Sequence, residues 1–171
     1  MLRVNFPRGK WFITVFFLTA LLVVAADLAS KDWIRSYSEG QIIFEAGIFR
    51  IIHVHNSGGV FGLFQGQFLP LVIFGFIGTT LVLLFVFFLL PRSPFLDAWL
   101  TRIALGLILS GTIGNLTDRL RFGYVTDFIS IGIWPVFNVA DSATTVGATI
   151  FIIFLLFSTS VRKHLQSGAL E

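Results

Sequence analysis

The chain has 171 residues, of which 56% are hydrophobic and only 12% are charged, so it is far more apolar than a soluble globular domain and indicates a membrane protein. Its net charge of +3 comes from basic residues scattered along the chain, which form no stripe and give no reason to expect a nucleic-acid partner. The absence of cysteine excludes disulfides, thiolate metal ligands and a cysteine nucleophile.

Four apolar segments are long enough to cross a hydrocarbon core about 30 Å thick, which takes about 20 helical residues. They cover residues 11–30, 68–90, 95–116 and 137–160. The first has an alternative interpretation as a cleavable signal peptide, because Arg3, Arg8 and Lys10 precede an apolar run that ends in small residues. We favour a retained span, since three more follow and the i, i+4 spacing of Asp27 and Lys31 indicates that the helix continues outward.

The connection at residues 32–67 contains two segments rich in β-branched and aromatic residues, 41–45 and 48–55, which are typical of strands. We expect them to form a small sheet that lies on the membrane surface as a cradle. Glycines 58, 59 and 62 permit tight turns there, and prolines 91 and 94 separate the second span from the third. The sequence therefore predicts an all-α membrane protein: one domain, residues 1–171, with a four-transmembrane-helix bundle and a small extracytoplasmic β-sheet between the first two helices.

Basic residues near the ends of the spans predict the orientation of the bundle. One side of the membrane receives Arg3, Arg8, Lys10, Arg92, Arg162 and Lys163. We expect this side to be the cytoplasm, with both termini inside and the loops at 32–67 and 117–136 outside. The outer loops also hold basic residues, so the asymmetry is modest.

Asp127 and Asp141 stand on either side of an apolar connection, residues 128–140. A turn there brings both carboxylates to the outer mouth of the bundle as a dyad, in which one carboxyl stays protonated as an acid and the other activates water. In the structural alternative, Asp127 ends a loop turn and Asp141 caps the fourth helix. The spacing leaves both interpretations open.

Polar and small residues recur along the third span. Gly111, Asn115 and Asp118 are spaced i, i+4 and i+7, so they share one stripe that must face protein or water. A ladder of small residues lets another helix approach closely, namely Gly106, Ser110 and Gly114. Arg119 follows Asp118 and is expected to form an interfacial ion pair with it, which contributes little if exposed.

Three smaller groups have both structural and functional interpretations. Asp27 and Lys31 orient a substrate head group, hold the first span to the bundle, or form only a local pair worth about 0.2–0.5 kcal/mol. Asn56 precedes a Ser-Gly-Gly segment, which favours an Asx-turn, although its side chain is also able to donate to a substrate. His53 and His55 share a strand face, and because no third His or Cys stands nearby, an exposed strand face explains them better than zinc.

Five segments together, in this order, resemble the bacterial lipoprotein signal peptidases (signal peptidase II), which are aspartyl proteases of the inner membrane. The segments are DLASK at 27–31, NSGGVFG at 56–62, GTIGNLTDR at 111–119, VTDF at 125–128 and PVFNVADS at 135–142. Each alone is a weak signal, but five in sequence on four spans are specific. Two features depart from the family pattern: the stretch between Asp127 and Asp141 is a few residues shorter, and Thr112 stands where many relatives have a second Gly.

The resemblance implies that Asp127 and Asp141 are the catalytic pair. It also implies a set of substrate-binding or supporting residues: Asp27, Lys31, Asn56, Gly111, Asn115, Asp118, Arg119, Asn138 and Ala140. The implied substrate is a prolipoprotein whose Cys already carries diacylglycerol, cut just before that Cys to release the signal peptide. The implied mechanism is activation of water by one Asp with help from the other, with no metal or other cofactor. Besides the substrate, membrane lipid is the expected partner, and we expect a monomer.

Two other classes of function were weighed against a peptidase. In a small transporter, Asp27, Asp118 and Asp141 would relay or coordinate ions, but the polar residues gather at one edge of the bundle and leave its middle apolar. In a non-enzymatic scaffold, the outer sheet would bind a partner, and the two carboxylates at the membrane edge would have no explanation.

Overall fold

The computed structural model describes residues 10–58, 65–93 and 96–167 of the chain. Its elements are α1 (Lys10–Ile34), β1 (Ile42–Ala46), β2 (Phe49–Asn56), α2 (Phe68–Leu84), a π-helical turn η2 (Phe85–Leu89), a 3-10 turn η3 (Leu90–Arg92), α3 (Trp99–Phe122), β3 (Val125–Ile131) and α4 (Val139–Ser167). Within the described residues, four helical segments are long and apolar enough to cross a membrane. The predicted four-helix membrane bundle with a small sheet is confirmed.

The helices differ from the expected spans mainly at their polar ends. The helix α1 continues to Ile34, as the spacing of Asp27 and Lys31 predicts. The helix α3 begins at Trp99 and runs to Phe122, past the expected end at 116, because Asp118 in its last turns is buried against partners from other elements. Gly123 then ends α3 in the left-handed conformation, with φ of 83°, which favours glycine. The segment 117–136, expected to be a loop, therefore contains the end of α3 and the strand β3.

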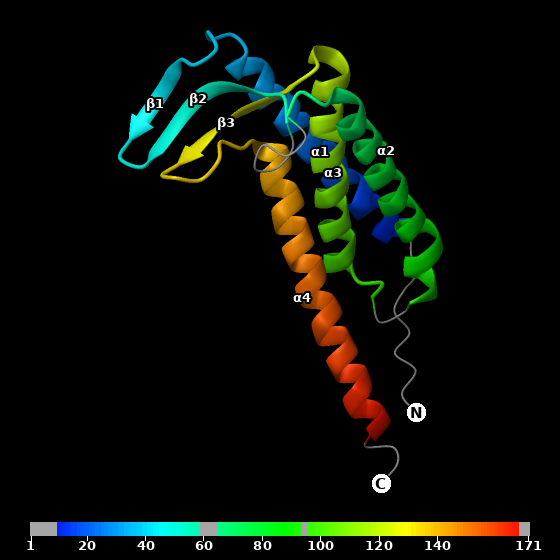
Figure 1. Ribbon diagram of the computed structural model, residues 1–171. Helices are drawn as coiled ribbons and strands as arrows, with labels where there is room; N and C mark the ends of the chain where they lie inside the picture. The colour runs from blue at the N-terminus through cyan, green and yellow to red at the C-terminus, as the bar shows by residue number, and fades with distance from the viewer. Residues whose placement is uncertain (1–9, 59–64, 94–95, 168–171) are drawn as a thin grey trace.

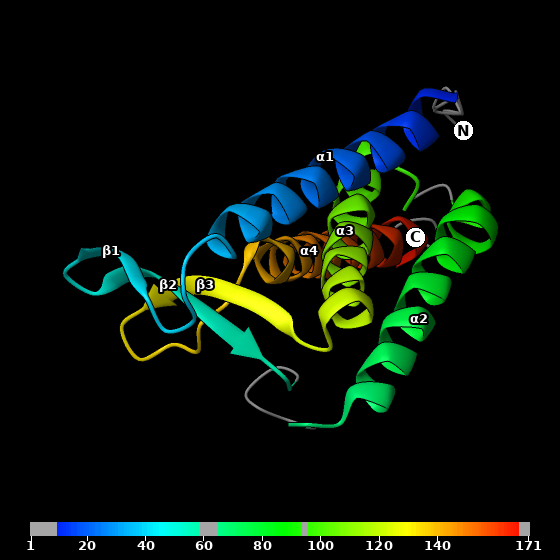
Figure 2. The ribbon, with the colours of Figure 1, turned by 90° about the horizontal axis from the view of Figure 1, so that it is seen from above.

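The helix α3 lies at the centre of the bundle and contacts each of the other three helices (Figure 2). Its membrane-spanning window is 56% buried, whereas the corresponding windows of the other three helices are each 17% buried. The outer helices therefore leave most of their apolar side chains exposed, as expected of surfaces that face lipid rather than water. The buried position of α3 explains why this span carries the polar stripe: its side chains meet protein.

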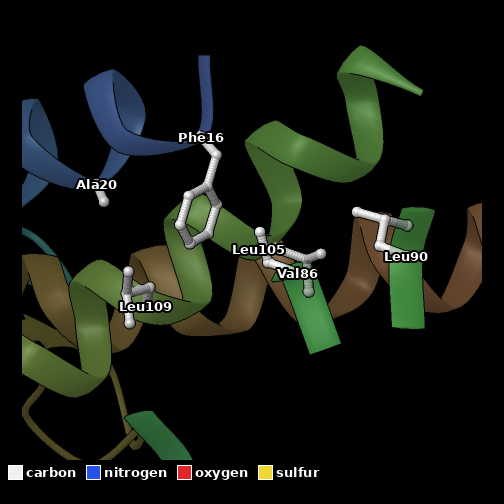
Figure 3. Packing of buried hydrophobic residues seen from close by; sticks show 6 residues of the cluster. All are labelled: Phe16, Ala20, Val86, Leu90, Leu105 and Leu109. Atoms are coloured by element: carbon white, nitrogen blue, oxygen red, sulfur yellow. The ribbon is translucent and has the colours of Figure 1, made fainter. Parts of the chain in front are cut away.

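The apolar core lies where α1, α3 and the turns after α2 meet (Figure 3). It consists of buried side chains from these three segments, namely Phe16, Ala20, Val86, Leu90, Leu105 and Leu109. The Phe16 ring, fully buried, points from α1 toward α3. This core occupies the part of the bundle away from the sheet and fixes the helices on which the polar end is built.

Glycines on α3 and α4 allow the helices to approach closely, as the ladder of small residues predicts. A Cβ atom at Gly106 would lie 2.8 Å from the carbonyl oxygen of Phe16 on α1. One at Gly147 of α4 would lie 2.6 Å from the carbonyl oxygen of Ala104 on α3. Only glycine fits at these crossings without a shift of the backbone, so the glycines set the distance of α3 from α1 and α4.

The three strands form an antiparallel sheet in the order β1-β2-β3, which projects sideways from one end of the bundle (Figure 1). The two strands predicted between the first two spans are confirmed to within one residue at each end. The third strand comes from the connection between α3 and α4, and its register places Asp127 opposite Val54 and Thr126 opposite His55. The sheet therefore brings the expected catalytic segment next to the end of β2. Several residues discussed above lie outside the described ranges, namely Arg3, Arg8, Gly59, Gly62 and Pro94.

Candidate active site

Asp127 lies in the middle of β3 with only 1% of its surface exposed. Each of its two carboxylate oxygens accepts a hydrogen bond from an asparagine side chain. Asn138 Nδ2 donates to Oδ1 at 2.7 Å, and Asn56 Nδ2 donates to Oδ2 at 2.8 Å. Two amides from two different elements therefore hold this carboxyl in one orientation.

Asp141 lies in the first turn of α4, where it forms a reciprocal helix cap with Asn138. The Asp141 N–H donates to Asn138 Oδ1 at 2.9 Å, and the Asn138 N–H donates to Asp141 Oδ2 at 3.2 Å. This is the capping-box arrangement, with Asn138 as the cap residue and Asp141 three positions on. The remaining oxygen, Oδ1, accepts a hydrogen bond from Asn115 Nδ2 of α3 at 2.7 Å. The interpretation of Asp141 as a helix cap is thus right in part. Asn138 is the cap residue, and Asp141 completes the capping box by binding the Asn138 N–H.

Asn138 joins the two carboxyl groups, because its side-chain amide donates to Asp127 Oδ1 and its backbone N–H donates to Asp141 Oδ2. Its Nδ2 group also lies 3.0 Å from Asn115 Oδ1. The pKa of Asp127 is raised to about 7, chiefly because the carboxyl is buried, and the negative charge of Asp141 acts in the same direction. A carboxyl with this pKa can hold or release a proton near neutral pH, which is a property that acid–base catalysis uses.

A buried ion pair between Asp27 and Lys31 lies behind the two carboxylates. Lys31 Nζ is 2.7 Å from Asp27 Oδ2, and neither side chain has any exposed surface. Asp27 Oδ1 also accepts the Ala140 N–H at 2.9 Å, so this carboxylate caps the start of α4 from another helix. Lys31 donates to Asn115 Oδ1 at 3.0 Å. The interpretation as a weak, local pair is therefore wrong, since the pair is fully buried. The alternative that it holds the first span to the bundle is confirmed, because it links α1 to α3 and α4.

Asp118 is the second buried carboxylate of this network and has no exposed surface. It lies 3.6 Å from Lys31 Nζ and 3.2 Å from Arg35 Nη1, and its Oδ2 accepts the Thr126 N–H at 2.9 Å. Asp27, Lys31, Arg35 and Asp118 thus place two negative and two positive charges in one buried cluster. The attraction between these opposite charges offsets part of the cost of burying them.

Arg119 and Asn56 meet at the start of the connection after β2. Arg119 Nη2 donates to the Gly58 carbonyl at 3.2 Å, and the Gly58 N–H donates to Asn56 Oδ1 at 2.9 Å. The predicted Asx-turn at Asn56 is confirmed, and the same side chain contacts Asp127. Within the described residues, Asp118 forms its ion pairs with Lys31 and Arg35 rather than with Arg119, so the predicted 118–119 pair is wrong. The guanidinium of Arg119 lies instead within electrostatic range of Asp127 and Asp141 as well as Asp118.

Two glycines of α3 leave room for the groups of the site. A Cβ atom at Gly111 would overlap the Ala140 carbonyl oxygen and the Thr144 hydroxyl, and one at Gly114 would overlap Asp27 Oδ2. Gly111 therefore lets the start of α4 lie directly on α3, and Gly114 accommodates the carboxylate of Asp27. Thr112, which departs from the family pattern, lies near Gly78 of α2 instead, 3.6 Å from where a Cβ would stand.

The two histidines of β2 lie beside the site. Their ring centroids are 4.8 Å apart, but His53 is only 4% exposed, so the explanation by an exposed strand face is wrong for this residue. His53 Nδ1 lies 2.8 Å from the Tyr37 carbonyl oxygen, and the His55 ring stacks on Tyr124 at 3.8 Å between centroids. Desolvation by burial lowers the pKa of His55, while the nearby Glu39 carboxylate acts in the opposite direction. These contacts make the pair part of the packing of the sheet.

The site contains two residues that the sequence analysis did not single out, Arg35 and Thr126. Arg35 contacts both Asp118 and Thr126, and Thr126 directly precedes Asp127. A signal for Arg35 is present in the sequence, because Asp27, Lys31 and Arg35 are spaced i, i+4 and i+8. This spacing places all three on one face of a helix that continues beyond its apolar run. No comparable signal marks Thr126.

Comparisons with known proteins identify the family of the chain. A family model described as signal peptidase (SPase) II matches residues 19–157. A lipoprotein signal peptidase of Dehalococcoides mccartyi is 44% identical over 158 residues, which cover 92% of this chain and 96% of that protein. Another, from Moorella thermoacetica, is 41% identical over 137 residues, which cover 79% and 88%.

A solved structure supports the same relationship. The structure of a bacterial membrane enzyme at 2.3 Å resolution has a TM-score of 0.78 and 29% identity, and the match covers 87% of this chain and 92% of that chain. A second, at 1.9 Å resolution, has a TM-score of 0.74 and 28% identity. With a family match over most of its length, close relatives and a shared fold, this chain belongs to the signal peptidase II family, and it is a multi-pass bacterial membrane protein.

Proposed function

We propose that the protein is a membrane aspartyl endopeptidase that cleaves diacylglyceryl-modified prolipoproteins just before the lipidated Cys. In this proposal Asp127 and Asp141 activate the attacking water. The observation that carries it is that Asn138 donates hydrogen bonds to both carboxyl groups, one of which is buried and has its pKa raised to about 7. Membership of a protease family sets aside the transporter and scaffold interpretations.

The two carboxyl groups differ in environment, which suggests different roles. Asp127 is almost fully buried, whereas Asp141 is half-buried at the start of α4. A buried carboxyl with a raised pKa favours the protonated form, so we assign Asp127 as the general acid. Asp141, which water reaches more easily, is the general base that deprotonates the attacking water. The water oxygen then bonds to the carbonyl carbon of the peptide and gives a tetrahedral intermediate. When the C–N bond breaks, Asp127 gives its proton to the leaving nitrogen.

The other polar residues support the pair by holding it in place. Asn56 and Asn138 orient the Asp127 carboxyl, and Asn115 orients Asp141. Asp27 and Lys31 fix the start of α4 against α1 and α3. Such fixed contacts keep the reacting groups in a productive geometry, which is a large part of catalytic rate. The chemistry needs no metal or other cofactor.

An open apolar groove beside the pair supports a lipid-modified substrate. Its volume is about 380 Å³, and it is lined by Ile131, Ile133, Trp134 and Phe137. Phe137 directly precedes Asn138, the residue that joins the two carboxyl groups. Apolar walls suit an acyl chain or the apolar side chains of a signal peptide. We place this end of the bundle on the outer side of the cytoplasmic membrane, with both termini inside and the chain acting as a monomer.

The proposal is tested by giving purified wild-type protein in detergent two forms of one prolipoprotein, with and without diacylglycerol on the Cys. We expect cleavage of the lipidated form only, with a product that begins at the lipidated Cys by mass spectrometry. The control for non-specific proteolysis is a precursor in which this Cys is replaced and the lipid is attached to a different residue. No cleavage by well-folded protein, or equal cleavage of both forms, contradicts the proposal.

The assignment of Asp127 as the general acid predicts a specific pH dependence. Its pKa of about 7 means that the protonated form dominates below pH 7 and is lost as the pH rises through this value. At two pH units above the pKa only about 1% remains protonated, so kcat is expected to fall by about 100-fold. The measurement is kcat for the lipidated precursor at saturating substrate across this pH range. A kcat that rises through pH 7 instead would reverse the roles of the two carboxyl groups.

A further inference from the structure

Arg35 follows the last turn of α1 and reaches the strand that carries Asp127. Its Nη1 donates to Thr126 Oγ1 at 2.8 Å and to Asp118 Oδ1 at 3.2 Å. Its Nη2 donates to Asp32 Oδ1 at 2.5 Å, and the guanidinium lies 4.5 Å from the centre of the Phe122 ring. Only 14% of its side chain is exposed. The guanidinium is therefore held in its plane by hydrogen bonds and in the perpendicular direction by stacking.

Thr126 is fully buried and is held from both its side chain and its backbone. Its hydroxyl accepts the hydrogen bond from Arg35, and its N–H donates to Asp118 Oδ2 at 2.9 Å. Successive side chains of a strand point to opposite faces, so the contacts of Thr126 lie on the face opposite to the Asp127 carboxyl. A displacement of Thr126 must move Asp127 with it, because the two residues share a peptide bond.

We propose that Arg35 is a positioning residue for Asp127, acting through a clamp formed by Arg35, Asp118 and Thr126. The clamp ties β3 to the ends of α1 and α3 and so fixes Asp127 relative to Asp141. Arg35 touches neither carboxyl group of the pair by any hydrogen bond found within the described residues. This inference rests on the proposed catalytic role of Asp127.

Arginine suits this position for a geometric reason. One guanidinium bonds Asp118, Thr126 and Asp32 together and stacks on Phe122. A lysine at the same place keeps the charge but offers a single ammonium group with no flat face, so it cannot make all these contacts at once. If Arg35 acts through these contacts, the Arg35→Lys variant has a lower kcat than the wild type. If only the positive charge matters, Arg35→Lys keeps the wild-type kcat.

The decisive variants are at Thr126, since they leave the charged residues unchanged. Thr126→Val has nearly the same shape but cannot accept the hydrogen bond from Arg35, whereas Thr126→Ser keeps the hydroxyl. For Thr126→Val we expect kcat on the lipidated precursor to fall by about 10- to 100-fold, since a shift of about 1 Å in a reacting group has effects of this size. KM is expected to stay within about twofold, and Thr126→Ser is expected to recover most of the wild-type kcat.

A double-mutant cycle with Arg35→Gln tests whether the two residues act as one unit. If Arg35 works through Thr126, the double variant has about the same kcat as Arg35→Gln alone, because the contact is already lost. Arg121→Gln is the matched control, since Arg121 also stacks on the Phe122 ring, at 5.1 Å, but is exposed. Its kcat is expected to equal that of the wild type.

Three outcomes overturn the inference: wild-type kcat in a folded Thr126→Val variant, additive effects in the cycle, or full recovery by Arg35→Lys. If Arg35→Gln fails to fold, the comparison of Thr126→Val with Thr126→Ser still decides. Asp127→Asn, measured in the same assay, separates this inference from the proposed function. If the Asp127→Asn variant cleaves the precursor at the normal rate, the proposed function is wrong. If Asp127→Asn is impaired but Thr126→Val cleaves at the normal rate, only the positioning role of Arg35 is wrong.

Discussion

Asp127→Asn and Asp141→Asn are each expected to lower kcat on a lipidated precursor by about 10³-fold or more, the upper part of the range for general acid–base groups. The amide of either variant can neither deliver nor take up a proton at the reacting bond. In Asp127→Asn, the new NH2 group also has to face one of the two asparagines that donate to the carboxylate, so one hydrogen bond is lost. KM is expected to change much less than kcat.

The double variant is expected to be no slower than the slower single variant, because the two carboxyl groups act as a unit. Glu45→Gln is the matched control, since it makes the same chemical change at an exposed position on β1 and is expected to keep wild-type kcat. Near-UV circular dichroism and thermal unfolding in detergent establish that the variants are folded. A folded Asp141→Asn protein that turns over substrate at the wild-type rate would remove Asp141 from the mechanism.

The bundle was predictable because the signal for a membrane span is local. A run of about 20 apolar residues must be helical in hydrocarbon, whatever the rest of the chain does. The exact ends were less predictable, because they depend on distant partners. The helix α3 extends past its apolar run to Asp118 and beyond, and Asp118 is buried against Lys31 of α1 and the N–H of Thr126.

The strand β3 could not be predicted from the hydrophobic pattern of its residues. It pairs with β2, and the paired residues are 69 to 82 positions apart in the chain. A local sequence pattern does not reveal such a long-range pairing. Five of its seven residues are buried, so it lacks the simple alternation of a strand with one wet face. The segment was therefore assigned to a loop, although its residues were identified as the site by family resemblance.

The expected site residues come together at one end of the bundle, but their contacts were not predictable from spacing. The sequence indicated that Asp27 pairs with Lys31, yet it gave no sign that Asp27 also binds the N–H of Ala140, 113 residues later. Arg35 stands beyond the apolar run, in the segment expected to be a loop. It directly follows α1, whose last turns carry the buried pair of Asp27 and Lys31.

Lys31→Met is expected to be the most destabilising single change in the polar network, by about 3–5 kcal/mol, as for the loss of one partner from a buried ion pair. Lys31 has no exposed surface and is the cation closest to Asp27, at 2.7 Å, while it also lies 3.6 Å from Asp118. Without it, the Asp27 carboxylate is left as an uncompensated buried charge. Asp118 retains its ion pair with Arg35 at 3.2 Å, so most of the cost is expected to arise at Asp27.

This reasoning predicts that a second substitution restores stability. Asp27→Asn removes the uncompensated charge, and its side-chain oxygen is still able to accept the Ala140 N–H. The double variant Asp27→Asn/Lys31→Met is therefore expected to be more stable than Lys31→Met alone, although both substitutions remove native contacts. The measurement is the free energy of unfolding in mixed detergent micelles, with Arg121→Met as an exposed control that should stay within about 0.5 kcal/mol of wild type. A loss below about 1 kcal/mol for Lys31→Met would mean that water reaches Asp27, and a double variant less stable than the single one would mean that packing, not charge, decides.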